Sequence, residues 1–215
     1  MSLISSRAIR QPGKVNILLL ADENDPLYDA QWNPHTFDNI DLIIGCGDLS
    51  AHYLERIADR FRGDVLYVPG NHDRTYIDHP PLGCICIDDT IYTWRGLRIL
   101  GLGGSMLYNY GPYQYSEREM KQRIRRLWFS LHRHKGFDIL VTHSPARGHY
   151  DGNDPCHTGF ESFISLIRKW KPRYFFHGHV HMSYGDFPRT YTIEDTIAIN
   201  AYTSCIVTLK LPDQS

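Results

Sequence analysis

Five short apolar runs constrain the fold of this chain more than any other feature of its sequence. Their length is typical of strands that are covered on both faces. Segments with helical spacing separate several of them, which predicts strand–helix–strand crossovers and therefore parallel strands. The runs are Val15–Ala21, Asp41–Cys46, Asp64–Val68, Asp138–Thr142 and Arg173–Phe176.

Three apolar stripes predict the helices. Each repeats every three or four residues, which places its apolar side chains on one helical face. Ser116 and Glu119 have the spacing of a capping box at the start of the second helix. The stripes are Tyr53, Leu54, Ile57, Ala58 and Phe61; Met120, Ile124, Leu127, Trp128 and Leu131; and Phe160, Phe163, Ile164, Ile167 and Trp170.

Two other stretches, Cys84–Gly101 and Tyr191–Leu209, contain short β-rich pieces separated by turns such as Asp88–Asp89 and Glu194–Asp195. They predict hairpins that form a second sheet or antiparallel edges. We therefore expect an α/β fold with two mixed β-sheets packed face to face and helices on the outside, a four-layer αββα sandwich.

Length and composition exclude several classes of protein. The 215 residues are 42% hydrophobic, which excludes a disordered chain, and no linker or repeat divides them. We expect a flexible N-terminus over 1–14 and a single domain over 15–211. With 23 Lys and Arg against 24 Asp and Glu, the net charge of −1 argues against binding nucleic acid or anionic membranes through bulk positive charge. No apolar run approaches the roughly 20 residues that span a bilayer, and no signal peptide is evident. Five cysteines without a dense framework favour a reduced, cytoplasmic setting.

Every predicted strand is followed by a carboxylate, amide or imidazole side chain. Ligands of open α/β sheets bind beyond the carboxyl ends of parallel strands, so adjacent ends would gather these side chains. Packed together without cations they would repel one another or be badly desolvated, and such donors suit divalent metals of intermediate softness. The sequence therefore predicts a metal site. In chain order the side chains are Asp22, Asp48, Asn71-His72-Asp73, His143, and His179 with His181.

These residues, in this order, resemble the motifs of the calcineurin-like metallophosphoesterase superfamily over about residues 15 to 200. The segment from His143 to Asp151, with Asn200-Ala201, is also similar to its class III phosphodiesterase branch. The motifs are Asp22, Gly47-Asp48, Gly70-Asn71-His72-Asp73, Thr142-His143 and Gly178-His179-Val180-His181.

The resemblance implies two divalent metal ions, with Mn²⁺ expected first and Fe, Zn or Ni as alternatives. Asp48 would bridge both ions. Asp22 and His181 would complete the first site, and the second site would be completed by Asn71, His143 and His179. Such a pair of cations lowers the pKa of a bridging water and stabilises the entering and leaving oxygens of an in-line displacement.

The implied activity is dimetal-dependent hydrolysis of phosphoesters by in-line attack of a bridging hydroxide. Asp48 and His72 would be the catalytic residues, with His72 binding a phosphate oxygen and protonating the leaving alkoxide. Asn71 would also contact the substrate. Two readings of His149 stay open, because its loop either contacts substrate or is solvated. Asp73 is expected to support the loop rather than to bind metal.

One position departs from the family pattern. The first motif usually reads Asp-x-His, whereas this chain has Asp22-Glu23-Asn24. Either Asn24 ligates, or Glu23 or Asp25 substitutes, or water fills the position. Each alternative predicts a first site that loses its ion more easily than the second, activity that depends on added Mn²⁺, and a tighter first site in Asn24→His.

Other features have a structural reading beside a functional one. His177 is expected to pack on the other side of its sheet. Alternation along a strand explains Cys84-x-Cys86 better than a metal knuckle does. The basic run from Arg118 to Lys135 is expected to form a solvated helix face. Four tyrosines precede that helix: Tyr108, Tyr110, Tyr113 and Tyr115. Three roles stay open for them, which are stacking on a nucleobase, covering the site and packing the loop.

We expect an enzyme that acts on a small phosphoester, more specifically a phosphodiester or nucleotide, with neither a membrane nor nucleic acid as partner. The oligomeric state stays open. The alternative is a non-catalytic binding or scaffold protein on the same fold with a weakened first metal site. Asn24 invites that alternative, and the retained His72 argues against it.

Overall fold

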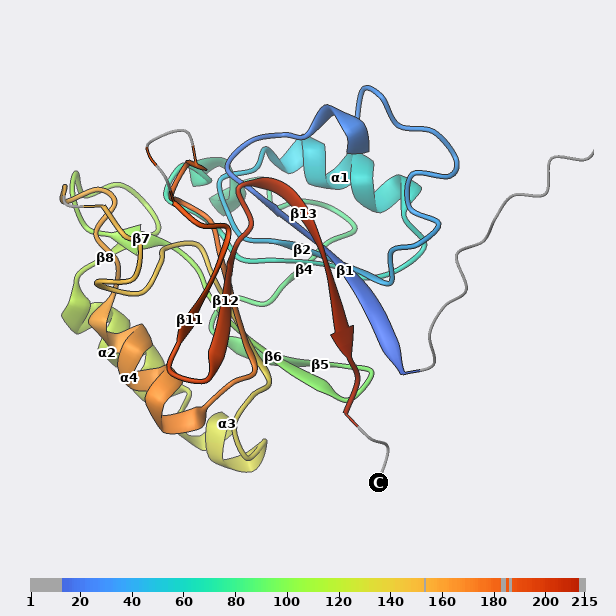
Figure 1. The fold of residues 1–215 in the computed structure, drawn as a ribbon. Coiled ribbons are helices and arrows are strands. Elements are labelled where there is room, and N and C mark those ends of the chain that lie inside the picture. The colour runs from blue at the N-terminus through green and yellow to red at the C-terminus, as the bar shows by residue number, and fades with distance from the viewer. Residues whose placement is uncertain (1–12, 153, 183–184, 186, 213–215) are drawn as a thin grey trace, which may run out of the picture.

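Two large β-sheets dominate the structure, a computed structural model that describes residues 13–152, 154–182, 185 and 187–212 (Figure 1). The first sheet, in spatial order, consists of Thr203–Lys210 (β13), Lys14–Ala21 (β1), Leu42–Gly45 (β2), Val65–Tyr67 (β3) and Ile85–Cys86 (β4). The second consists of Thr190–Ile193 (β11), Thr196–Asn200 (β12), Tyr174–His177 (β10), Ile139–Thr142 (β9), Leu97–Leu102 (β6) and Thr90–Trp94 (β5). A small parallel pair joins Ser105–Met106 (β7) to Gln114–Tyr115 (β8).

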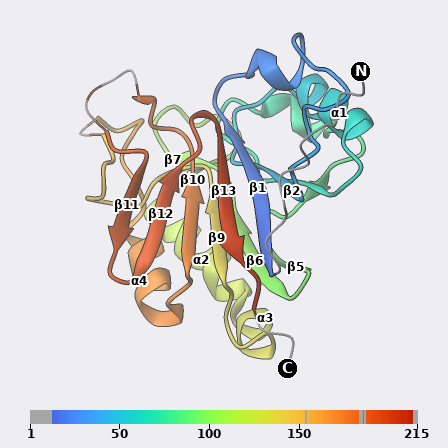
Figure 2. The ribbon, with the colours of Figure 1, turned by 45° about the vertical axis from the view of Figure 1, so that its right-hand side comes forward.

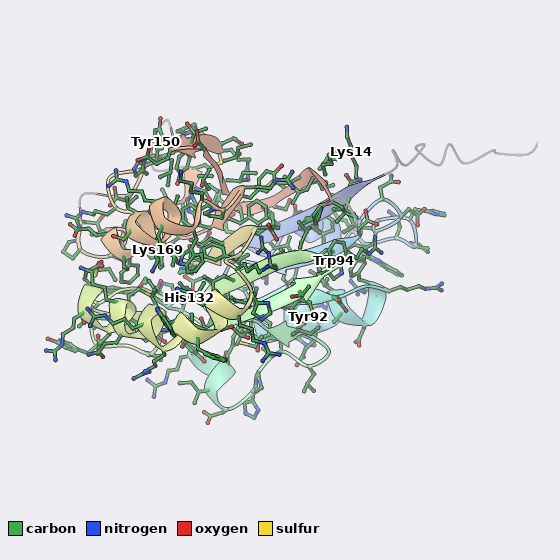
Figure 3. The ribbon with its side chains drawn as sticks, turned by 90° about the horizontal axis from the view of Figure 1, so that it is seen from below. Lys14, Tyr92, Trp94, His132, Tyr150 and Lys169 are labelled. Atoms are coloured by element: carbon green, nitrogen blue, oxygen red, sulfur yellow. The ribbon has the colours of Figure 1, made fainter. Side chains whose placement is uncertain are left out.

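Helices cover the outer face of each sheet (Figure 2). One α-helix packs on the first sheet and three pack on the second; His132 and Lys169 mark this second helical layer in Figure 3. The prediction of a four-layer αββα sandwich is confirmed. The α-helices are Ala51–Arg60 (α1), Glu117–Arg126 (α2), Trp128–Arg133 (α3) and Glu161–Trp170 (α4), and the short 3₁₀ helices are Pro26–Tyr28 (η1) and Arg74–Ile77 (η2). Along the described ranges no helix has the length and apolar character needed to cross a membrane.

Three hydrophobic clusters hold the layers together, and β1 shows why its sequence is continuously apolar. Ile17 and Leu19 face the second sheet, whereas Leu18 and Leu20 face α1. Side chains alternate along a strand, so a strand covered on both faces needs an apolar residue at every position. On the outer face of the second sheet, α4 buries Phe163 and Ile167 against Phe175.

The polypeptide enters and leaves the first sheet close to the predicted boundaries. β1 begins at Lys14, one residue inside the segment predicted to be flexible, and Leu211 N–H donates to the Gly13 carbonyl at 2.8 Å. The rest of that predicted segment, 1–12, lies outside the described residues.

The predicted strand ends converge, but from two sheets rather than from one. β1, β2 and β3 are parallel neighbours in the first sheet, and β9 and β10 are parallel neighbours in the second. Within each set a backbone hydrogen bond joins neighbouring loops: Asp22 N–H donates to Gly47 and Gly178 N–H donates to His143, at 3.1 and 2.9 Å. The two sets meet where the His179 backbone N–H donates to Asp22 Oδ1 at 2.9 Å.

Three local predictions are wrong or incomplete. The helix expected through Trp128 breaks at Leu127 into α2 and α3, and Trp128 is 58% exposed because α3 turns its ring outward. Arg123, expected on a solvated face, is buried. The turn at Asp88–Asp89 carries the chain from β4 in one sheet to β5 in the other, whereas Glu194–Asp195 does close a hairpin, β11–β12.

Candidate active site

Five of the residues predicted for the site line one cavity at the carboxyl ends of the central strands, namely Asp22, Asp48, His72, His179 and His181. Its volume is about 240 Å³. Asp22 follows β1, Asp48 follows β2, and His179 follows β10, so both sheets contribute. The lining residues are Asp22, Asp48, His72, Cys156, His157, His179 and His181.

Three donor side chains meet at a fourth, His143, which is fully buried. Its Nε2 lies 3.2 Å from Asp48 Oδ2, 3.1 Å from Asn71 Oδ1 and 3.0 Å from His179 Nδ1. These are the residues that the resemblance assigns to the second cation, and the structure brings all of them together.

The tautomers of the two histidines follow from their outer partners. His143 Nδ1 lies 2.8 Å from the Cys46 carbonyl oxygen, and His179 Nε2 lies 2.7 Å from the Cys156 carbonyl oxygen. A carbonyl only accepts, so each of these nitrogens carries the hydrogen. The facing nitrogens of the neutral rings then present lone pairs to each other and to the Asn71 and Asp48 oxygens. Lone pairs that converge without a hydrogen between them need a cation, so this donor set fits a divalent metal ion.

Without a bound cation, one proton takes the cation's place. Burial opposes the charge on His143, but Asp48 and then Asp22 outweigh it and raise the pKa of His143 to about 9. Burial and the charge of His143 lower the pKa of His179 to about 3. Asp48 is also buried, yet the His143 charge lowers the pKa of Asp48 to about 2. The cluster therefore holds one proton between Asp48 and His143, and a cation that binds there must displace it.

Three of the predicted ligands have a strained backbone. Asp22, Asp48 and His179 have φ angles of 67°, 56° and 69°, in the left-handed region that non-glycine residues rarely occupy. Each residue lies just after a strand or its following glycine, at the point where the chain turns sharply. Strain of this kind persists only where the surrounding contacts over-determine it, and here it aims the side chains into the cavity.

The glycines of the motifs provide the space that these side chains occupy. A Cβ on Gly70 would lie 2.1 Å from Asp48 Oδ1, and one on Gly178 would lie 2.8 Å from Asp22 Oδ2. Both contacts are far inside van der Waals separation. The pairing of glycine with a donor in the sequence is therefore a packing requirement of the cavity.

Asp73 supports the loop, as predicted. Its Oδ2 accepts hydrogen bonds from the backbone N–H groups of Asp48 and Gly70, at 2.8 and 2.7 Å. Burial and then the charge of Asp48 raise the pKa of Asp73 to about 7. Asp73 thus connects the β2 loop to the β3 loop beneath the cavity.

The residues assigned to the first cation are arranged more loosely. Asp22 accepts the His179 backbone N–H with both carboxylate oxygens, at 2.9 and 3.0 Å, and burial raises the pKa of Asp22 to about 7. His181 is half-buried, with its ring 4.8 Å from that of Tyr202. Both line the cavity, but neither lies within the tight group around His143.

None of the three side chains considered at the first motif, those of Asn24, Glu23 and Asp25, is among the residues that line the cavity. Asn24 is exposed, and its Nδ2 donates to the Ser50 hydroxyl at 3.4 Å. Glu23 accepts from the Tyr202 hydroxyl at 2.6 Å. Asp25 accepts the Leu27 N–H at 2.9 Å, which caps η1. The assignment of Asn24 to the first cation stays a prediction.

The remaining site predictions separate into those at the cavity and those away from it. The His72 ring lines the cavity, and its backbone N–H donates to Asp48 Oδ1 at 2.8 Å. His149 is half-buried on its loop and is not among the lining residues. His177 packs in the interior as predicted, with Nε2 2.8 Å from the Tyr191 hydroxyl, and burial lowers its pKa to about 4.

Of the four tyrosines, Tyr108 approaches a predicted ligand. Its hydroxyl accepts from Asn71 Nδ2 at 3.2 Å, which orients Asn71 Oδ1 toward His143. Tyr113 and Tyr115 pack in hydrophobic clusters, and Tyr110 is 88% exposed.

Two lining residues, Cys156 and His157, were missed by the sequence reasoning. Both lie on the loop between β9 and α4, the loop in which the sequence analysis singled out His149 instead. The only available signal was an Asp-Pro-Cys-His run, Asp154 to His157, that follows no strand.

Comparison with known proteins places this geometry in a family. A sequence profile described as calcineurin-like phosphoesterase matches residues 17–183. The chain therefore belongs to the calcineurin-like phosphoesterase family. It is 29% identical to UPF0046 protein C25E10.12 of Caenorhabditis elegans, over 80% of this chain and 70% of that protein.

Solved structures agree on the fold. TT1561 of Thermus thermophilus superposes with a TM-score of 0.58 at 16% identity and covers 87% of this chain and 89% of its own. The 5'-nucleotidase of Candida albicans superposes with a TM-score of 0.50 at 15% identity, over 87% of this chain and 45% of its own.

Proposed function

We propose that this protein is a metal-dependent phosphodiesterase that hydrolyses small phosphodiesters or nucleotides with two divalent cations, Mn²⁺ foremost. The observation that carries the proposal is the convergence of the Asp48, Asn71, His143 and His179 donor atoms beside a cavity that His72 also lines.

The charge of the lining favours a diester over a monoester. Among the described residues that line the cavity there is no Lys or Arg. A phosphomonoester carries up to two negative charges and is usually held by guanidinium or ammonium groups, whereas a phosphodiester carries one. A cavity whose only positive groups are cations and imidazoles suits the less charged substrate.

The protein's own groups have distinct roles in this proposal. Six side chains would hold the cations: those of Asp22, Asp48, Asn71, His143, His179 and His181. The cations would make a bound water more acidic and stabilise the negative charge that develops at phosphorus. The backbone hydrogen bond from His72 to Asp48 holds the His72 imidazole at the cavity, where it protonates the leaving oxygen. Asn71 orients the phosphate beside it.

The test is hydrolysis of bis-p-nitrophenyl phosphate compared with p-nitrophenyl phosphate, each with added Mn²⁺. We expect turnover of the diester, a lower kcat/KM for the monoester, and a loss of at least about 10³-fold in Asp48→Asn, since removal of the bridging carboxylate disables both cations. His72→Asn should lower kcat by about 10²-fold, the usual contribution of a general acid, with metal content unchanged.

A scaffold function predicts a different result. If no diester turns over with Mn²⁺, Fe²⁺, Zn²⁺ or Ni²⁺, the protein uses the fold to bind rather than to hydrolyse.

We also propose a reduced, cytoplasmic setting for the protein. None of the five cysteines, all of which the structure describes, forms a disulfide, and this supports the proposal.

A further inference from the structure

The loop between β9 and α4 contributes a histidine to the cavity that the motif assignments do not use. His157 lines the same space as Asp48 and His72, and its ring lies 5.3 Å from that of His179. Its side chain is 26% exposed, which leaves part of the ring accessible.

A carboxylate holds this imidazole in place. His157 Nδ1 lies 2.8 Å from Asp154 Oδ2 and 3.0 Å from Asp154 Oδ1. A carboxylate on one ring nitrogen fixes the orientation of the ring, as in other carboxylate–histidine pairs.

The loop is itself anchored on both sides of His157. Asp151 accepts the backbone N–H groups of Gly148 and Gly159, at 2.8 and 2.9 Å. The Cys156 carbonyl accepts from His179 Nε2 at 2.7 Å, so the loop is bonded directly to a predicted metal ligand. The position of His157 relative to His179 is therefore determined by the same contact that orients the His179 ring.

A third cation on this loop is the competing reading, because Asp154, Cys156 and His157 have donor atoms within 4.8 Å of one another. The hydrogen bonds argue against it. Asp154 Oδ1 already accepts the backbone N–H groups of Cys156 and His157, at 2.9 and 3.0 Å, in addition to the imidazole. A cation bound by this carboxylate and this imidazole would have to displace the contact between them, which holds the ring.

We propose that His157, positioned by Asp154, is a substrate-binding residue that contacts a phosphate oxygen or the leaving group of the phosphodiester. This inference rests on the proposed function. It assigns to an imidazole the contact that Lys or Arg makes in many phosphate sites, in a cavity whose described lining has neither.

The experiment measures kcat and KM for bis-p-nitrophenyl phosphate with Mn²⁺ in His157→Leu, His157→Gln and Asp154→Asn. We expect kcat/KM to fall about 10- to 100-fold in His157→Leu, less in His157→Gln, which retains a polar group, and about 3- to 10-fold in Asp154→Asn, mostly through KM. Bound metal and thermal melting should match the parent protein.

The matched control is an exposed Asp–His pair of the same spacing far along the chain. His35 Nδ1 lies 2.9 Å from Asp38 Oδ2 at i,i+3, and His35→Gln should leave both kinetic constants unchanged. His149→Gln tests the sequence-based alternative: a loss there, with His157→Leu unchanged, would overturn the inference.

The inference and the proposed function fail in distinguishable ways. If the parent protein is inactive, only the proposed function is contradicted. The role of His157 is then tested by calorimetry, which measures the binding of inorganic phosphate to the Mn²⁺-loaded protein. Equal phosphate affinity in parent and His157→Leu contradicts the inference. A loss of bound metal in His157→Leu would show instead that the loop holds a cation.

Discussion

The Arg123 cluster and the His143 cluster both bury carboxylates, and they obtain positive charge in different ways. The Arg123 guanidinium is 5% exposed and donates to Asp88 at 2.6 Å, to Asp89 at 2.9 Å and to the Gly103 carbonyl at 2.8 Å. Its charge is permanent. The His143 cluster has only a dissociable proton, which a metal ion can replace.

The difference explains why one cluster is structural and the other is suited to take up a cation. Burial works against the charge of Arg123, but Asp88 outweighs it and raises the pKa of Arg123, so the guanidinium and its carboxylates neutralise one another within the protein. At His143 the donor atoms of four side chains face one another, and only an exchangeable cation satisfies them. A cluster completed by the protein needs no ligand, whereas an incomplete one has donor atoms left to offer a ligand.

Removing the permanent charge should have the largest effect on stability. Arg123→Met leaves Asp88 buried without its partner, so we expect a loss of about 3–5 kcal/mol in the free energy of unfolding. Urea denaturation with and without Mn²⁺ measures it, and the loss should be the same in both. Arg126→Met, on the exposed side of α2, is the control. A loss below about 1 kcal/mol would show that the cluster is not stabilising.

Binding of a divalent cation at the His143 cluster should stabilise the folded protein. Mn²⁺ at a hundredfold excess over its Kd should raise the free energy of unfolding by about 2.7 kcal/mol, because it binds only the folded protein. Thermal melts in chelator and in Mn²⁺ measure the increment. Asp48→Asn should lose it, whereas Arg126→Met should keep it. An increment that survives in Asp48→Asn would place the ion elsewhere.

The pH dependence sharpens the comparison further. His143 has a pKa raised to about 9 in the metal-free fold, so its stabilising contribution is complete below the unfolded value of 6.5 and is lost as pH rises through 9. Between pH 7 and 9 we expect metal-free stability to fall by about 2 kcal/mol and Mn²⁺ affinity to rise. Melts across this range check both trends. In His143→Gln the fall should disappear, and a metal-free stability that is flat in the parent would contradict the assignment.

The smallest effect is expected at the first cation. Asn24 lies beside Ser50 rather than in the cavity lining, so the first cation lacks a ligand from this position. An imidazole in Asn24→His would supply that ligand, and we expect it to tighten binding of the weaker cation by about tenfold, or about 1.4 kcal/mol. Calorimetric titration with Mn²⁺ measures two affinities in the parent protein, and Asn39→His, at another exposed asparagine, is the control. Two equally tight ions in the unmutated protein would refute a weakened first site.

The sequence by itself determined the strands and the donors that follow them. A strand covered on both faces must be apolar throughout, and the turn after it must admit both a glycine and a donor, so β1, Asp22 and the Gly70-Asn71 pair are readable locally. The Ser116–Glu119 capping box is readable for the same reason, because both partners lie within one helical turn.

Only the tertiary structure decided which distant groups meet. Periodicity placed Trp128 inside and Arg123 outside, but the break at Leu127 turns Trp128 outward, and the crossover at Asp88–Asp89 brings carboxylates to Arg123. His157 reaches the cavity because its loop bonds to His179, which follows a different strand. Local spacing carries no information about such contacts, since they depend on how two sheets stack against each other.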